Sequence, residues 1–387
     1  MKIACRVQSL TSSPTLAITS KAKQLKKSGV DVVSFGAGEP DFDTPVHIKK
    51  SAIKAINEGF TKYTPSAGMP QLKQAIVEKL KRDNNLQYDP SQIVVSNGAK
   101  HSLYSILQTI CDKGDEVIIP VPYWVSYPEM VKVAQGKAVF ILGEEKNKFK
   151  ITAKQFEKAI KKKTRALIIN SPANPTGCVY TKEELKQIAD IAANYGICVI
   201  SDEIYEKLVY DKAEHVSIAS LNEKMLSLTF TVNGLSKAYS MTGWRIGYLA
   251  GPKDAVLKIS NLQDHSTSCP NSIAQAAAVT ALTSSDECID KMKKEFVKRR
   301  NYIVDRINAI KGLSVIKPEG AFYVFCNISK TGLNSLEFAQ RLLDEAQVAV
   351  IPGIGFGDDH YIRLSFATST EQIEKGLDRI SKWVKLI

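Results

Sequence analysis

Short runs of apolar, β-branched residues alternate along this chain with longer segments of helical periodicity, and this alternation most constrains its fold. Between two such runs, residues 181–195 show a helical pattern that opens with the capping pair Thr181 and Glu184 and stops at Gly196. Continuous apolar strands separated by helices predict an α/β fold, with a mostly parallel sheet covered on both faces. The candidate strands are residues 92–96, 116–120, 166–170, 198–202, 226–232 and 246–250.

The pattern changes after Cys269-Pro270. A long helical pattern over roughly residues 286–310 is followed by shorter alternating segments and a final helix; the segments are residues 313–316, 322–326, 348–351 and 361–366. The stretch before Thr44 is too short to fold alone. We therefore predict a large domain over residues 45–284 and a smaller α+β domain that combines residues 1–44 and 285–387.

The composition is that of a globular protein with a large core, since 44% of the 387 residues are hydrophobic and 24% are charged. The net charge of +12 is compatible with nucleic acid, an anionic membrane surface or small acidic molecules. The lysines occur mostly in twos and threes on segments of helical pattern, which is typical of a solvated face. We therefore expect no nucleic-acid or membrane partner, and an anionic cofactor with a dianionic substrate fits the charge as well.

The seven cysteines are odd in number and include no C-x-x-C pair, which predicts reduced residues in a cytoplasmic protein rather than disulfides. The five histidines are far apart in the sequence, so we expect no metal site. The N-terminal segment MKIACRVQSL lacks the apolar stretch of a secretory signal, and no run is long enough to span a bilayer.

Ligands in open α/β sheets bind where strands end and helices begin. The segments at the predicted strand ends supply a carboxylate, a phenol, an amide, an aromatic plane, an amine, an arginine and a helix N-terminus. An anionic, aromatic aldehyde cofactor requires this combination. The segments are residues 97–100, 122–124, 170–177, 201–205, 233–237 and 242–245.

Each group suits one part of such a cofactor. Asp202 can hold a proton on a pyridine nitrogen, and Tyr205 and Asn174 can donate to the oxygen of the ring. Trp124 can stack on the ring face, while Lys237 can form an imine with the aldehyde and later act as a base. The phosphate would lie at the helix start Gly98-Ala99-Lys100 and near the residues that flank the lysine, Ser236 and Arg245.

Taken singly, these residues also have structural explanations. Asp202 could cap a helix, Lys237 and Arg245 could be surface charges, and Trp124 could be a core residue. The chain has no G-x-x-x-x-G-K-[ST] motif, and the glycines at 353, 355 and 357 miss the G-x-G-x-x-G spacing.

The combination resembles a known family. The segment Gly234-Leu-Ser-Lys237-Ala-Tyr-Ser-Met-Thr-Gly-Trp-Arg245-Ile-Gly247 closely resembles the lysine signature of class I aminotransferases, which have fold type I of the pyridoxal-phosphate enzymes. Residues 170–177 and 201–205 resemble two other cofactor segments of that family, and the likeness runs from about Arg6 to the C-terminus. It implies pyridoxal 5′-phosphate as the cofactor and a seven-stranded sheet in the large domain.

The resemblance also assigns roles to residues. It implies that Lys237 is the catalytic imine lysine, and that the cofactor is held by Gly98, Ala99, Lys100, Trp124, Asn174, Asp202, Tyr205, Ser236 and Arg245. Arg363 matches the family's arginine for the substrate α-carboxylate, which Gly38 would approach through its backbone N–H. Tyr63 resembles a tyrosine that reaches the phosphate of the neighbouring subunit, which implies a homodimer. A plain turn aromatic is the alternative for Tyr63.

The substrate follows from two further segments. Residues 6–15 and 97–100 resemble the bacterial and plastidic branch that acts on aspartate, in which Lys100, Ser13 and Thr15 would hold the distal carboxylate beside Trp124 and Asn174. In some members of that branch a threonine at the position of Thr11, together with the lysine, accompanies amination of prephenate, whereas other members have lysine at that position. Lys100 as a solvent-facing residue is the structural alternative.

The expected reaction moves the amino group of L-aspartate to 2-oxoglutarate in two steps, giving oxaloacetate and L-glutamate, with prephenate as a further acceptor. The partners are thus small dicarboxylic amino and keto acids. Three alternatives remain: an aminotransferase of other specificity, a pyridoxal-phosphate C–S β-lyase, and a ligand-binding regulatory protein on the same fold. Ser13, Thr15 and Lys100 favour transamination, since a lyase has less need of a distal cation.

Overall fold

The computed structural model describes residues 2–8, 10 and 14–387 of the chain. Within this part, the largest sheet has seven strands in the order β2-β8-β7-β6-β5-β3-β4. All neighbours are parallel except that β8 runs antiparallel to both β2 and β7. The mostly parallel sheet predicted from the sequence is thereby confirmed. The strands are β2 (Ile93–Ser96), β3 (Glu116–Val121), β4 (Lys137–Leu142), β5 (Thr164–Asn170), β6 (Cys198–Asp202), β7 (Thr229–Gly234) and β8 (Gly247–Ala250).

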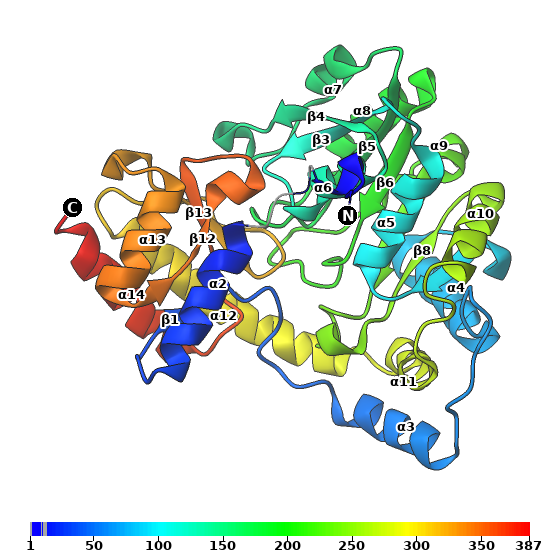
Figure 1. The fold of residues 1–387 in the computed structure, drawn as a ribbon, viewed down its shortest axis with the longest axis horizontal. Coiled ribbons are helices and arrows are strands. Elements are labelled where there is room, and N and C mark those ends of the chain that lie inside the picture. The colour runs from blue at the N-terminus through cyan, green and yellow to red at the C-terminus, as the bar shows by residue number, and fades with distance from the viewer. Residues whose placement is uncertain (1, 9, 11–13) are drawn as a thin grey trace.

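Helices cover both faces of this sheet (Figure 1). Successive residues of the central strands point to opposite faces, so Ile168 packs with α5, α6 and α10, while Leu167 packs with α7, α8 and α9. A third cluster joins α3, α4 and α11 beside β2 and β8. The helices are α3 (Val46–Asn57), α4 (Pro70–Asn84), α5 (Ala99–Ile110), α6 (Ser126–Val133), α7 (Ala153–Ala159), α8 (Lys182–Tyr195), α9 (Glu223–Leu228), α10 (Lys253–Asp264) and α11 (Ser272–Thr283).

A second group of elements surrounds a four-stranded sheet in the order β12-β13-β10-β9 and a separate parallel pair, β1 with β11 (Figure 1). Its core takes residues from both ends of the chain, including Phe35 and Trp383. The strands are β1 (Val33–Ser34), β9 (Ser314–Val315), β10 (Tyr323–Asn327), β11 (Val348–Ala349), β12 (Ile351–Pro352) and β13 (Tyr361–Ser365). The helices are α2 (Pro14–Lys27), α12 (Glu287–Asn308), α13 (Ser335–Ala346) and α14 (Thr370–Val384).

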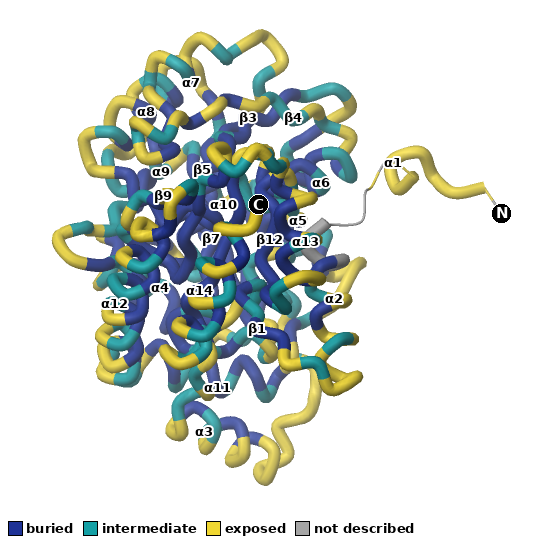
Figure 2. Tube along the Cα trace, turned by 90° about the vertical axis from the view of Figure 1, so that its left-hand side faces the viewer, coloured by how far each residue is buried: buried dark blue, intermediate teal, exposed yellow. Residues whose placement is uncertain are grey.

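Short elements complete the described chain. The four-residue helix α1 (Cys5–Gln8) is exposed along its length, whereas buried residues fill the interior of the molecule (Figure 2). Among the described residues, no helix is both long and apolar enough to cross a membrane. The 3-10 turns are η1 (Pro90–Gln92), η2 (Glu145–Asn147), η3 (Ile218–Ser220), η4 (Thr242–Trp244), η5 (Ser329–Thr331) and η6 (Gly353–Phe356).

The predicted helix over residues 181–195 is confirmed as α8. The Thr181 hydroxyl accepts from the Glu184 N–H, the Glu184 carboxylate accepts from the Thr181 N–H, and Gly196 ends the helix at a φ of 66°. Glycine reaches this left-handed conformation without the steric cost of a Cβ atom.

Two strand predictions need correction, and one strand was not predicted. Residues 226–228 end α9 instead of opening a strand, because the Asn222 side chain caps that helix by accepting from the Met225 N–H. Strand β4 was not predicted; it is an edge strand that pairs only with β3, within the described sheet, and exposes Phe140 and Leu142. The predicted strand at 348–351 is divided, since β11 pairs with β1 while β12 pairs with β13.

Candidate functional site

A cavity of about 580 Å³ lies at the carboxyl ends of β5, β6 and β7. Its walls also include residues from the second group of elements, among them Gly36, Tyr323 and Arg363. The sequence-predicted site residues that line the cavity are Gly38, Ala99, Lys100, Trp124, Asn174, Asp202, Tyr205, Ser236, Lys237, Arg245 and Arg363. The fold therefore brings most of the predicted constellation into one place.

Lys237 follows β7 and places its amine at the centre of this group. Its Nζ donates a hydrogen bond to the backbone oxygen of Gly38. Burial lowers the pKa of Lys237 to about 8; Glu39 acts against this shift, while the positive charge of Arg363 adds to it. A larger fraction of this amine is therefore neutral near neutral pH than in a free lysine, which is the form that reacts with an aldehyde.

Asp202 ends β6 and is buried. Its Oδ2 accepts from the Tyr127 hydroxyl at 2.7 Å and its Oδ1 accepts from the Ile204 N–H at 3.3 Å. Burial raises the pKa of Asp202 to about 6, against the lowering effect of these two hydrogen bonds. The group is thus mostly ionised at neutral pH, and a cationic ring nitrogen nearby would favour the ionised form further.

Trp124 and Tyr127 are linked by their position on the chain. They lie three residues apart at the start of α6, and their rings meet edge to face, with centroids 5.4 Å apart and planes at 82°. Trp124, which is available for stacking on a ligand, is therefore in contact with Tyr127, which donates the hydrogen bond to Asp202.

Arg363 lies on β13 and is almost fully buried. Its Nη1 donates to Asn174 Oδ1 at 3.0 Å and its Nη2 donates to the Gly36 oxygen at 3.1 Å. The guanidinium carbon lies 4.3 Å from the centre of the Tyr323 ring, whose hydroxyl is hydrogen-bonded to that of Tyr205 at 2.9 Å. Arg363 Nε is buried and finds no hydrogen-bond partner among the described residues. A buried donor without a partner is costly, and a bound carboxylate is one group that could satisfy this guanidinium.

The N-terminus of α5 faces Arg245. None of the described side chains caps this helix, and its N-cap residue Gly98 has a φ of 85°. The Arg245 guanidinium donates to the backbone oxygens of Thr242 at 2.9 Å and Asn97 at 3.2 Å. A Cβ atom at Gly98 would lie 2.3 Å from Arg245 Nη2, so glycine allows this close approach. Uncapped N–H groups beside a guanidinium suit a phosphate.

Lys100 extends from the first turn of α5 over Trp124, with its Nζ 4.8 Å from the ring centre. Partial desolvation, followed by the like charge of Arg245, lowers the pKa of Lys100. Lys100 is thus a further cationic side chain of the cavity, besides Arg363 and Arg245, for an anionic ligand.

Other predicted site residues are not placed in the cavity. Tyr63 is 91% exposed and is absent from the described lining, and Gly98 borders the cavity as the cap of α5. Thr11 and Ser13 lie outside the described residues. Thr15 lies in α2, but its side chain also lies outside the described part.

Several lining residues were missed by sequence reasoning. Tyr127 had only a weak local signal, which is its position three residues after Trp124 in the turn that opens α6. Tyr323 had none, because its partners Tyr205 and Arg363 are distant in sequence. Other lining residues outside the predicted segments are Thr19, Gly36, Leu103, Val125, Ser126, Ile351 and Phe356.

Comparison with known proteins identifies the family. Residues 30–380 match the family described as aminotransferase class I and II. The chain belongs to this family. It is 52% identical over 390 residues to an aspartate aminotransferase of Geobacillus stearothermophilus, with 100% of this chain and 99% of the relative covered. It is 44% identical over 393 residues to an aspartate/prephenate aminotransferase of Nitrosomonas europaea, with 98% and 99% covered.

A solved structure agrees with this assignment. The aspartate aminotransferase of Thermus thermophilus with maleate superposes with a TM-score of 0.96 at 42% identity, and 99% of each chain is covered. Membership of the aminotransferase family implies pyridoxal 5′-phosphate as the cofactor. The residues fit that group, since an amine of lowered pKa, a buried carboxylate and an uncapped helix start beside Arg245 line one cavity.

The lowered pKa of Lys237 predicts an unusual pH profile of reactivity. In cofactor-free protein, labelling of Lys237 by an amine reagent should reach half its plateau rate near pH 8, whereas a free lysine side chain reaches it near pH 10.5. Competitive labelling followed by peptide mass spectrometry measures this rate. The reference is Nα-acetyl-lysine amide, whose side-chain amine is free. A midpoint equal to that of the reference compound would contradict the assigned environment.

The hydrogen bond from Tyr127 predicts a pH-dependent stability loss in Tyr127→Phe. Because the folded-state pKa of Asp202 is raised above that of the unfolded chain, its ionisation opposes folding as the pH rises through about 6. Removing the Tyr127 donor raises this pKa further, so the variant should lose more stability at about pH 8 than at about pH 5, by roughly 1.4 kcal/mol per added pKa unit.

Urea unfolding of the cofactor-free protein at both pH values measures this difference. Tyr104→Phe, at a partly exposed position on α5, is the control for loss of a tyrosine hydroxyl. Equal losses for Tyr127→Phe at the two pH values would contradict the prediction.

Proposed function

We propose that this chain is an aspartate aminotransferase that moves the amino group of L-aspartate to 2-oxoglutarate, giving oxaloacetate and L-glutamate. The observation that carries the proposal is one cavity lined by the Lys237 amine and by Arg363 and Lys100, two cationic side chains from different segments that are available besides the proposed phosphate partner Arg245. A dicarboxylic amino acid offers one carboxylate to each cation. The name of the Geobacillus stearothermophilus relative supports the same substrate.

The proposed cofactor is pyridoxal 5′-phosphate bound to Lys237, and when bound it supplies an electron sink for the negative charge that develops at the substrate Cα. Asp202 would hold a proton on the ring nitrogen, because its carboxylate is buried and ionised. Tyr205 and Asn174 would donate to the ring oxygen, and Trp124 would cover the ring. The proposed phosphate donors are the backbone N–H groups of Gly98, Ala99 and Lys100 at the start of α5, together with Ser236 and Arg245.

Lys237 has the main chemical role in this proposal. Its Nζ would first hold the cofactor and then, once freed by the substrate amine, take the proton from the substrate Cα and deliver it to the cofactor. A base for this transfer must be neutral, and the lowered pKa of about 8 gives this amine a far larger neutral fraction than a free lysine has at the same pH.

The proposed partner of the substrate α-carboxylate is Arg363. Asn174 and the Gly36 oxygen hold its two terminal nitrogens, and the Tyr323 ring lies against its face, which fixes the plane of the guanidinium. Gly38 would add a backbone N–H. A planar, fixed guanidinium suits a carboxylate better than a flexible ammonium would.

Lys100 is the proposed partner of the distal carboxylate, with Thr11, Ser13 and Thr15 as further candidates. Prephenate also has two carboxylates, so the same pair of cations supports it as a second amino acceptor. The name of the Nitrosomonas europaea relative supports this second activity. A C–S β-lyase has less need of a distal cation, so Lys100 favours transamination.

We infer in addition that the protein works in the cytoplasm. We also infer that it is divided into two domains, one of residues 45–284 and the other of residues 1–44 and 285–387. All seven cysteines are free thiols, as a reducing compartment would keep them. The division is supported by the core clusters, since one cluster combines residues such as Phe35 and Phe338 from the two ends of the chain.

The activity is tested with purified protein, aspartate and 2-oxoglutarate, followed by coupled detection of oxaloacetate. Arg363→Leu should raise the KM for aspartate roughly 10- to 150-fold, since a charge-assisted hydrogen bond contributes about 1.5–3 kcal/mol. Lys100→Met should raise the KM for aspartate but leave that for alanine, which lacks the distal carboxylate, nearly unchanged.

Prephenate in place of 2-oxoglutarate tests the second activity through arogenate formation. The cofactor absorbance of both variants is the control for an intact Lys237 site. A wild-type protein that forms no oxaloacetate, or an Arg363→Leu variant with a normal KM for aspartate, would refute the corresponding assignment.

We further propose a homodimer in which Tyr63 completes the neighbouring site at the phosphate. Apolar side chains are exposed on and after α3, at Val46, Ile53, Ile56 and Phe60, next to Tyr63 itself. Several large apolar side chains exposed on and after one helix are typical of a protein interface. Two-fold symmetry would give each site the tyrosine of its partner.

Mixing two impaired variants tests this arrangement. Lys237→Ala supplies an intact Tyr63, and Tyr63→Ala supplies an intact Lys237, so one site of each mixed dimer would have both residues. We expect the mixture to exceed the summed activities of the separate variants, and light scattering to give the mass of a dimer. A monomeric wild type, or no gain on mixing after subunit exchange, would contradict the proposal.

A further inference from the structure

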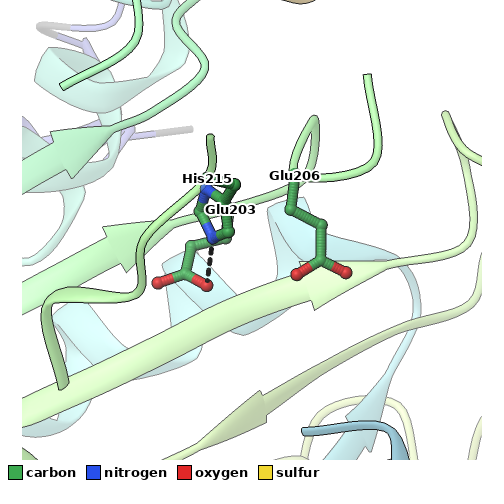
Figure 3. A group of neighbouring side chains, drawn as sticks. All are labelled: Glu203, Glu206 and His215. Atoms are coloured by element: carbon green, nitrogen blue, oxygen red, sulfur yellow. Dashed lines mark hydrogen bonds and ion pairs between the residues drawn. The ribbon is translucent and has the colours of Figure 1, made fainter. Parts of the chain in front are cut away.

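The turn that follows β6 has two sets of side chains with different surroundings. Asp202 and Tyr205 line the cavity, whereas Glu203 and Glu206 do not belong to its described lining. Both glutamates are nevertheless buried. Figure 3 shows Glu203 and Glu206 near His215, with the carboxylate of Glu203 directed to the His215 ring. A buried carboxylate has to be matched by donors or cations, so its partners show what it holds in place.

Glu203 has partners on three separate segments. Its Oε1 accepts from the Ser201 hydroxyl at 2.9 Å, on β6 itself. Its Oε2 accepts from the Ser217 hydroxyl at 2.5 Å and from Asn84 Nδ2 at 3.3 Å, and lies 3.0 Å from His215 Nε2. The side chain therefore ties the end of β6 to the end of α4 and to the segment before η3.

Glu206 extends the same network. Its Oε2 accepts from Asn84 Nδ2 at 2.7 Å, and its other oxygen forms an ion pair with Lys79. Burial acts against ionisation, but the charges of Lys79 and His215 outweigh it and hold the pKa of Glu206 below its ordinary value. Lys79 Nζ also donates to Asn84 Oδ1 at 2.6 Å. The three potential metal ligands Glu203, Glu206 and His215 lie close together, but the ammonium of Lys79 already supplies a cation to Glu206.

We propose that Glu203 is a positioning residue for cofactor binding, which fixes the turn of residues 202–206 so that Asp202 and Tyr205 face the ring. This inference rests on the proposed function. The backbone supports it, because the Glu203 N–H donates to the Val232 oxygen at 2.9 Å and the Glu206 N–H donates to the Glu203 oxygen at 2.9 Å. The strand end, the turn and the Glu203 side chain thus form one connected unit.

A carboxylate with several hydrogen-bond partners, such as that of Glu203, is suited to fixing the turn of residues 202–206. Hydrogen bonds to an ionised group are shorter and more directional than apolar contacts, so they define the place of the backbone more narrowly. Groups that hold the direct ligands of a cofactor commonly affect its affinity without touching it. An apolar residue at position 203 would fill the volume but would leave the Ser201 and Ser217 hydroxyls without this acceptor, while Asn84 would keep only its bond to Glu206 among the two glutamates.

The test is Glu203→Gln, which keeps the size of the side chain, removes its charge and replaces one acceptor oxygen with a donor. Titration of the cofactor-free variant with pyridoxal 5′-phosphate should give a Kd roughly 10- to 100-fold above that of the wild type. The increase in Tm on adding the cofactor should be smaller than in the wild type. Because Glu203 would act through the cofactor, the KM for aspartate in the saturated enzyme should change far less than the Kd.

Thr229→Val is the matched control, since the Thr229 hydroxyl on β7 is buried and has no hydrogen-bond partner among the described residues. This control should bind the cofactor with the wild-type Kd. Should Glu203→Gln not fold, Ser217→Ala removes a single donor to Glu203 and should raise the Kd by a smaller factor.

A foldable Glu203→Gln with lowered Tm but a wild-type Kd would overturn the proposal and leave Glu203 as a purely structural group. An unchanged Kd in Ser217→Ala, in case that variant has to be used, would overturn it equally. Failure of the proposed function is distinguishable, because the wild-type protein itself would then not take up pyridoxal 5′-phosphate at Lys237.

Discussion

The site depends on a carboxylate that is kept ionised away from water. Asp202 is buried at the end of a central strand, and burial by itself would favour its protonated form. The Tyr127 hydroxyl and the Ile204 N–H offset part of this cost by donating to the two oxygens. A cationic group placed beside Asp202 would favour the ionised form further, which is the basis of the proposed pairing with a protonated ring nitrogen.

The charges on the other walls complement this acid. Lys237, Arg363, Lys100 and Arg245 line the same cavity, and burial lowers the pKa of Lys237 to about 8. Mutual repulsion among these cations is relieved when anionic groups bind, so a phosphate and two carboxylates fit the balance of charge. The net charge of +12 distributed over the chain agrees in sign with this local excess, although most lysines lie elsewhere on the surface.

The cavity is built from distant parts of the chain. Gly36 and Gly38 come from near the N-terminus and Arg363 comes from β13, while the acid and the amine follow β6 and β7. The bonds of Arg363 to Asn174 and to the Gly36 oxygen span 189 and 327 residues of sequence. Such contacts hold the second group of elements against the large sheet at the place where the ligand would bind. Behind the wall, the network around Glu203 ties the same turn to α4.

Sequence alone determined the elements whose signals are local. The capping pair Thr181 and Glu184 and the closing Gly196 fixed α8, and the order of polar strand ends fixed which residues would meet, because parallel strands end at one edge of a sheet. The sequence did not reveal the edge strand β4, because an edge strand has a weak pattern of apolar residues. It also placed the start of β7 too early, because the apolar residues before β7 belong to the capped helix α9.

Only the tertiary structure decided which groups act on each other through space. Periodicity could not reveal that Tyr127 donates to Asp202, that Tyr323 lies against Arg363, or that Lys79 and Glu206 pair behind the site. These partners lie far apart along the chain, and their contacts exist only because the packed helices and sheets exclude water and bring them together. The sequence therefore determined the inventory of chemical groups, whereas the fold determined their burial, their partners and hence their charge states.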